Sequence, residues 1–381
     1  MMKTVTLEKL RSGIFVLLLT ASTPGLGYTA PGSPDEVNDI TGTALIKTDE
    51  ILKLNAKMRS MVDQYIKPIG GTERRAQALY DLMFEPDKLA LKYDNSYTKT
   101  AAETVESGSG NCISLASAFI AMGRYAGLDV KYLHFEIPEV WQRETDFYYQ
   151  YKHISAAVRI SSDEYLGIDF ELMSNIDHVR KRELTDEQGF GAFYCNRGVE
   201  LLMQGHTDTA MAYLLRAIDI DPDNSNNWSN LGVAYRRLNQ LDKAEYAYKQ
   251  ALHKNKSDLS ALNNLAILYQ MTGKAKIAQK YSKKLERYLR RNPYYMIKLA
   301  KQEIEKGNYS KALKWAKKAI KKNDSEQEFY YVAARAYAYL GDRDKAMHNL
   351  ELAEKYAHQS QNKNQYSRKL ELLRDMKKSG N

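Results

Sequence analysis

Three side chains have the types and the order that thiol-based acyl transfer requires. Cys112 follows the turn Gly108-Ser109-Gly110-Asn111 and opens an apolar-striped segment, while His153 and Asp169 lie in two strand-like segments further on. A thiol attacks as its thiolate, which a helix N-terminus and a nearby imidazolium both stabilise. An acid then fixes the tautomer and orientation of the imidazole. The hypothesis is a Cys-His-Asp site, provided that the fold brings the three residues together.

The segments around these residues predict an α+β domain over residues 48–185. We expect a helix that starts at Thr48-Asp49-Glu50 and continues to Tyr65, a second after Gly70-Gly71-Thr72, irregular chain over 85–110, and a helix from Cys112 to Gly127. Strand-like segments follow at 129–137, 153–160 and 165–171. Helices followed by strands are typical of α+β folds.

The second half of the chain repeats every 34 residues. One series consists of alanines: Ala210, Ala244, Ala278, Ala312 and Ala346. Twelve positions before each alanine lies a small residue: Gly198, Gly232, Ala266, Ala300 and Ala334. The turn between the two series holds Gly205, Asn239, Gly273, Gly307 and Gly341. Small residues let paired helices approach closely, and the turn positions tolerate a left-handed backbone. This period is the tetratricopeptide signature and predicts an all-α solenoid of five repeats over 191–360, with a capping helix and tail over 361–381.

The N-terminal residues have the pattern of an export signal. A basic region at Lys3, Lys9 and Arg11 precedes the short apolar core 14–19 and small residues up to Gly27. We expect a signal peptide over 1–27, a linker over 28–47, and export to the periplasm or cell envelope. The alternative is an uncleaved segment that tethers the chain to a membrane.

The sequence contains no His/Cys cluster with metal-ligand spacing and no phosphate-binding or dinucleotide glycine loop, so we expect no metal and no cofactor. The two cysteines, Cys112 and Cys195, fall in different predicted domains. We expect thiols at both positions, and a structural disulfide is the alternative that spacing alone leaves open.

Residues 48–180 resemble the transglutaminase-like, papain-related superfamily, and with the repeats they are similar to an exported bacterial group that joins the two. The resemblance is carried by Thr100-Ala101-Ala102-Glu103, Gly110-Asn111-Cys112, His153 and Ile168-Asp169-Phe170. It implies a transglutaminase-like cysteine-hydrolase fold with Cys112 as nucleophile, His153 as base and Asp169 as the orienting residue. The superfamily includes peptidases, amidases, protein cross-linkers and inactive members, so the resemblance implies no substrate.

Two features of the repeats indicate partners. Asn196, Asn230 and Asn264 occupy one position of three successive repeats, where side-chain amides can pair with an extended peptide without selecting its sequence. The alternative is polar filling of an exposed face.

The second feature is the charge distribution. Residues 191–381 carry a net charge of +15 and residues 1–190 a net charge of −6, and pairs of basic residues are frequent over 274–322. For an exported chain, acidic protein segments, anionic lipid or envelope polymers are better partners than nucleic acid. The alternative is a solvated lysine-rich helical surface without a partner.

The sequence therefore supports two functions. The first is an exported thiol-dependent acyl-transfer enzyme, a peptidase or amidase or a transglutaminase-like acyltransferase, whose repeats recruit a protein or peptide. The second is a non-catalytic envelope adaptor that uses the repeat groove for protein–protein interaction. Whether water or an amine resolves the acyl-enzyme stays open at this stage.

Overall fold

The computed structural model describes residues 45–136, 141–144, 147–150, 153–162, 164–168, 170, 180–357 and 363–371. Every described residue belongs to one compact unit, Gly32–Asn381. The predicted signal peptide and all but the last three residues of the predicted linker therefore lie outside the described residues, as do residues 372–381.

From residue 45 onward, where the description of the chain begins, five helices precede the central sheet: α2 (Thr48–Ile51), α3 (Ala56–Tyr65), α4 (Thr72–Phe84), α5 (Ala101–Ser107) and α6 (Cys112–Tyr125). The prediction of one helix from Thr48 to Tyr65 is wrong, because Asn55 accepts a hydrogen bond from the Met58 N–H at 2.9 Å and starts a new helix. The prediction of irregular chain over 85–110 is also wrong in part. There Thr100 and Glu103 form a capping box that starts α5, a signal the sequence contained.

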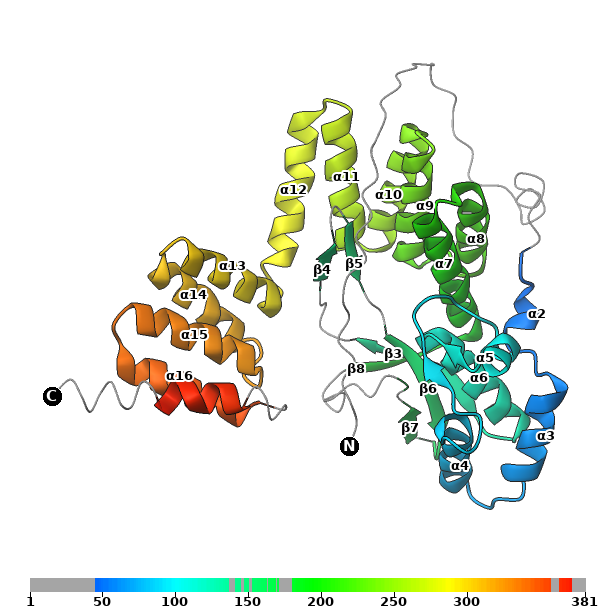
Figure 1. Ribbon diagram of the computed structural model, residues 1–381. Coiled ribbons are helices and arrows are strands. Elements are labelled where there is room, and N and C mark those ends of the chain that lie inside the picture. The colour runs from blue at the N-terminus through cyan, green and yellow to red at the C-terminus, as the bar shows by residue number, and fades with distance from the viewer. Residues whose placement is uncertain are drawn as a thin grey trace. The chain divides into compact units, whose positions relative to one another are not determined.

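The central sheet is antiparallel and has the strand order β7-β6-β3-β8. Its strands are β3 (Val130–Glu136), β6 (His153–Arg159), β7 (Tyr165–Ile168) and β8 (Arg180–Leu184). Two short pairs stand apart from it, β1 (Lys92–Tyr93) with β2 (Ser109–Gly110), and β4 (Trp141–Glu144) with β5 (Phe147–Gln150). The helix that begins at Cys112 packs against β6 and β3, which places the predicted nucleophile's helix on the strand that begins at His153 (Figure 1).

The repeat half consists of five helix pairs (Figure 1). Their bounds are α7 (Asp186–Gln204) and α8 (Thr207–Ile220), α9 (Ser225–Arg237) and α10 (Leu241–Lys254), α11 (Leu259–Met271) and α12 (Ala275–Leu289), α13 (Pro293–Glu305) and α14 (Tyr309–Ile320), and α15 (Gln327–Tyr339) and α16 (Arg343–Lys355). The transition from an α+β part to an all-α part confirms the predicted fold class.

The repeat register has the physical basis that its spacing predicted. All five turn residues adopt a positive φ, including the non-glycine Asn239 at 58°. The alanine series is buried throughout. A Cβ added at Gly232 would lie 2.4 Å from the Tyr248 ring, so the paired helices α9 and α10 approach too closely for any side chain there.

One hydrophobic core joins the α+β part to the first repeats. It extends from Ile51 to Ala278, whereas the fourth and fifth repeats have separate clusters around Ile297 and Leu350. The first repeat helix, α7, begins at Asp186, ahead of the predicted array start at 191. Its Gly189 lies so close to Tyr132 of β3 that a Cβ would come within 2.3 Å of the ring. The first repeat is therefore packed into the α+β part rather than linked to it by a tether.

Beyond the fifth repeat the chain is helical over 363–371, where Leu370 and Tyr366 pack on that repeat. Residues 358–362 and 372–381 lie outside the described residues, and the capping role of 361–381 stays a prediction. Within the described ranges, no helix combines the length and the apolar character needed to cross a membrane.

We predict that Ala244→Phe destabilises the repeats by about 1–3 kcal/mol, because the side chain at 244 is fully buried and the larger ring has no room. Thermal unfolding of the purified chain measures the effect. The matched control is His253→Phe, which places the same ring at an exposed position of the same helix. Equal melting temperatures for the two variants would contradict the proposed register.

Candidate active site

Cys112 is the first residue of α6, and its helix turn is held by Asn111. The Asn111 side chain caps the helix, with Oδ1 accepting from the Ser114 N–H at 3.0 Å and from the Ser114 hydroxyl at 2.8 Å. Cys112 is half-buried, whereas Asn111 and Ser114 are buried. The thiol thus stands at the positive end of the helix dipole, where a thiolate is stabilised.

The cap continues as a chain of hydrogen bonds that runs from the buried Asn111 and Thr98 to the half-buried Glu200 of the first repeat. The Asn111 Nδ2 donates to the Thr98 Oγ1 at 2.7 Å, and the Thr98 hydroxyl donates to the Glu200 Oε1 at 2.5 Å. The Thr98 N–H donates to the second carboxylate oxygen at 3.0 Å. Glu200 lies on α7, so a repeat residue is connected to the residue beside the candidate nucleophile.

Arg197, one turn before Glu200 on α7, packs against the same segment. Its guanidinium lies 3.5 Å from the centroid of the Tyr97 ring and donates to the Thr98 carbonyl at 3.4 Å. Burial raises the pKa of Glu200, while the hydrogen bonds from Thr98 and the charge of Arg197 act in the opposite direction. Nothing in the sequence pointed to Thr98 or Glu200, because they are 102 residues apart.

His153 and Asp169 are only partly within the described structure. The backbone of His153 opens β6 and pairs with Phe135 of β3, while its side chain and the whole of Asp169 lie outside the described residues. Two contacts fix the chain around them. The buried Ser155 hydroxyl donates to the Ile168 carbonyl, directly before Asp169, and the Phe170 ring lies 5.9 Å from that of Phe119 on α6. The segments that carry all three predicted residues thus belong to one helix-on-sheet unit, and the triad itself stays a prediction.

The asparagine series lies on the first helices of three successive pairs, α7, α9 and α11. Asn196 and Asn230 are half-buried, and Asn264 is 9% exposed. Asn230 donates from Nδ2 to the sulfur of Cys195 at 3.2 Å, so part of its hydrogen-bonding capacity is used within the array. Cys195 and Cys112 are both thiols, as expected. In repeat four the position is the exposed Lys298, and in repeat five the fully buried Val332 ends the series.

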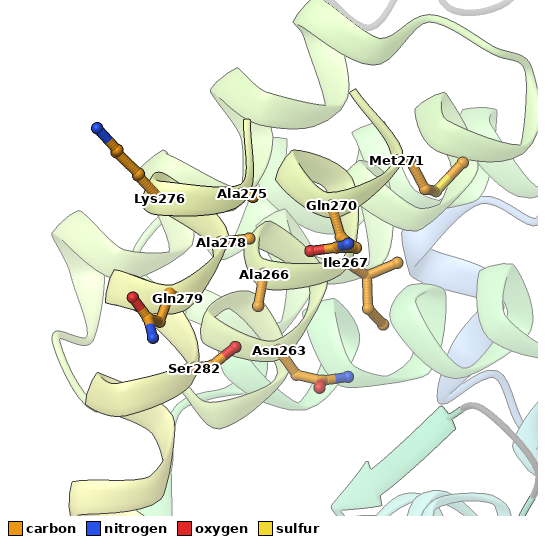
Figure 2. A pocket seen from close by; sticks show the side chains of 10 residues that line it. All are labelled: Asn263, Ala266, Ile267, Gln270, Met271, Ala275, Lys276, Ala278, Gln279 and Ser282. Atoms are coloured by element: carbon orange, nitrogen blue, oxygen red, sulfur yellow. The ribbon is translucent and has the colours of Figure 1, made fainter. Parts of the chain in front are cut away.

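A hollow of about 730 Å³ lies between α11 and α12 of the third repeat (Figure 2). Its lining combines apolar and amide side chains from both helices: Asn263, Ala266, Ile267, Gln270, Met271, Ala275, Lys276, Ala278, Gln279 and Ser282. Asn263 lines this hollow while its neighbour Asn264 belongs to the asparagine series, so the two adjacent amides serve different surfaces.

The basic pairs of 274–322 are largely on the surface. Four exposed lysines lie at the end of α14: Lys317, Lys318, Lys321 and Lys322. Two exposed arginines, Arg290 and Arg291, directly follow α12. Trp315 lies beneath two of these cations, with Lys318 at 4.9 Å and Arg290 at 5.5 Å from its ring. Of the residues that the structure describes, no three His, Cys, Asp or Glu side chains are grouped to hold a metal ion.

Comparison with protein families identifies both halves of the chain. Residues 59–170 match the transglutaminase-like superfamily, and residues 192–224, 213–246 and 327–357 match tetratricopeptide repeats. The chain therefore contains a transglutaminase-like domain followed by tetratricopeptide repeats, as its sequence predicts. An enzymatic role and a protein-binding role are accordingly the candidate functions.

Curated relatives match part of the chain. A protein O-mannosyl-transferase of Homo sapiens is 25% identical over 185 residues, which cover 47% of this chain and 20% of that protein. A TPR repeat-containing protein of Methanocaldococcus jannaschii is 28% identical over 146 residues, or 38% of this chain and 26% of that protein. The chain thus spans about a fifth to a quarter of their lengths. The crystal structure of yeast Tom70 is similar at 17% identity and a TM-score of 0.34, covering 52% of this chain and 45% of that one.

Proposed function

We propose that the chain is a thiol-dependent acyl-transfer enzyme, a peptidase, amidase or transglutaminase-like acyltransferase, whose repeats recruit a protein or peptide. The observation that carries the proposal is the position of Cys112. It is the first residue of a helix that packs on the strand beginning at His153, inside the segment that matches the transglutaminase-like superfamily.

The proposed chemistry follows from these positions. His153 accepts the thiol proton, and the sulfur of Cys112 forms a bond to the carbonyl carbon of a peptide-type amide. The Cys112 backbone N–H, at the helix start, stabilises the oxyanion. The C–N bond then breaks, and the leaving amine takes the proton from His153. Water or a second amine next attacks the thioester and returns the sulfur to its starting state, while Asp169 holds the imidazole in one tautomer.

We predict that Cys112→Ala abolishes acyl-transfer activity and that His153→Ala slows alkylation of Cys112 at neutral pH, because the imidazole promotes formation of the thiolate. Asp169→Asn should also lower activity, through the wrong imidazole tautomer. The rate of iodoacetamide labelling at each cysteine, resolved by peptide mass spectrometry, measures the effect without a known substrate.

The buried Cys195, 7% exposed, is the internal reference for that labelling. If Cys112 is labelled at the rate of an ordinary thiol, and His153→Ala leaves that rate unchanged, the enzyme proposal fails. The chain is then better explained as an envelope adaptor that acts through its repeats, a role that the three matched repeat segments would support by themselves.

We also propose that Asn196, Asn230 and Asn264 bind an extended peptide. Their amides recur once per repeat on the first helix of each pair, and amides can both donate to and accept from a peptide backbone. The exposed basic pairs near Trp315 would favour an anionic protein segment or membrane surface at the following repeats.

Replacing Asn264 with Ala should weaken binding of short synthetic peptides by about 1–3 kcal/mol if backbone groups of the peptide are left unpaired. Asn263→Ala is the matched control, since this neighbouring amide lines the hollow between α11 and α12. Lys317→Ala with Lys318→Ala should instead reduce the dependence of affinity on ionic strength. Equal peptide affinity for the Asn264 and Asn263 variants would leave the series as surface filling.

Export to the periplasm or cell envelope is the third part of the proposal, and it rests on the basic, apolar and small-residue order of residues 3–27. We expect a mature N-terminus near Tyr28, determined by mass spectrometry of the protein purified from its source. An intact Met1 or Met2 on protein from a cytoplasmic fraction would remove the export proposal and the envelope partners inferred from it.

A further inference from the structure

We propose that Glu200, on the first repeat helix, is a positioning residue that holds the helix turn of Cys112 through Thr98 and Asn111. This inference rests on the proposed function and adds a residue outside the transglutaminase-like segment 59–170 to its machinery. It makes the first repeat part of the framework of the active site as well as a binding module.

The direction of each hydrogen bond in this chain is set by Glu200. An ionised carboxylate can only accept, so the Thr98 hydroxyl must turn its hydrogen toward Glu200, at 2.5 Å. The lone pairs of that hydroxyl then face Asn111, which has to present its NH2 group, at 2.7 Å. The amide oxygen of Asn111 is thereby left to accept from the Ser114 N–H, which is the bond that caps α6.

Three members of the chain are buried and Glu200 is half-buried, so the chain has few alternative arrangements. Thr98 and Ser114 are fully inaccessible and Asn111 is 5% exposed, which means that water cannot replace a lost partner cheaply. A second bond fixes the same geometry, because the Thr98 N–H donates to the other oxygen of Glu200 at 3.0 Å. A glutamine at 200 has one oxygen and could satisfy only one of these two donors.

Glu200 also lies on the helix that carries Asn196, the first member of the proposed peptide-binding series. Asn196 and Glu200 are four residues apart on α7 and therefore on one face of that helix. Arg197 anchors the same stretch by stacking on Tyr97, next to Thr98. The position of α7 is thus transmitted to the cap of α6 through direct contacts.

The test is the pH profile of iodoacetamide labelling at Cys112 in the full chain. Glu200→Ala and Thr98→Val should each slow labelling at neutral pH by about tenfold, the effect of losing one buried hydrogen bond, and displace the profile to higher pH. Thr98→Ser, which keeps the hydroxyl, should restore the profile. The control is Glu187→Ala, an exposed carboxylate on the same helix, which should leave labelling unchanged.

A double variant separates positioning from general destabilisation. If Glu200 acts through Thr98, then adding Glu200→Ala to Thr98→Val should slow labelling by less than the product of the two single effects, because only the bond from the backbone N–H of residue 98 remains to be lost. Independent, additive effects would overturn the proposal, as would wild-type labelling of the Glu200 variant. If Glu200→Ala does not fold, Glu200→Gln removes one of the two acceptors and gives the same readout.

Failure of this inference can be told from failure of the proposed function. Slowed labelling in His153→Ala together with wild-type labelling in Glu200→Ala would refute the positioning role alone. Wild-type labelling in both variants would refute the enzyme proposal and the positioning role with it.

Discussion

The hydrogen-bond chain from the buried Ser114, Asn111 and Thr98 to the half-buried Glu200 is the constraint on which the arrangement of this molecule depends. An unpaired polar group in such a place costs about 1–3 kcal/mol, so each member requires the next. The last member comes from the repeat array, and the hydrophobic core crosses the same boundary. Moving α7 away from the α+β part would therefore expose apolar surface and leave Thr98 without its acceptor.

This joint explains why α7 differs from the other first helices of the array. It starts at Asp186, and its first turns pack on the sheet, with Gly189 against Tyr132. Arg124 of α6 and Asp186 close the same corner with two hydrogen bonds of 2.7 Å each. One helix therefore completes the α+β part with its N-terminal half and begins the solenoid with the rest. The α+β part and the repeat array become mechanically continuous by this means.

The sequence predicted features that depend on interactions between residues near one another in the chain, and it missed those that depend on distant residues. The 34-residue register could be predicted because small residues and left-handed turns are local requirements, and Gly232 against Tyr248 shows how strict they are. The predicted helix from Thr48 to Tyr65 failed because the Asn55 cap outweighed a continuous apolar stripe. The link from Thr98 to Glu200 could not be predicted, because a threonine and a glutamate 102 residues apart form no recognisable sequence pattern.

The candidate site likewise contains a local part that the sequence predicted and a distant contact that it did not. The turn, the cap and the helix that begins at Cys112 are contiguous in the sequence, and the structure reproduces them. The cap also has a structural consequence, because Asn111 accepts from the N–H of Ser114 and so fixes the first turn of the helix. It therefore stabilises the helix start at which Cys112 stands. An asparagine fixed in the opposite orientation would present its NH2 to the helix N–H groups and lose the cap. The acceptor that prevents this orientation is Glu200, which is how a repeat residue comes to matter for a thiol in another domain.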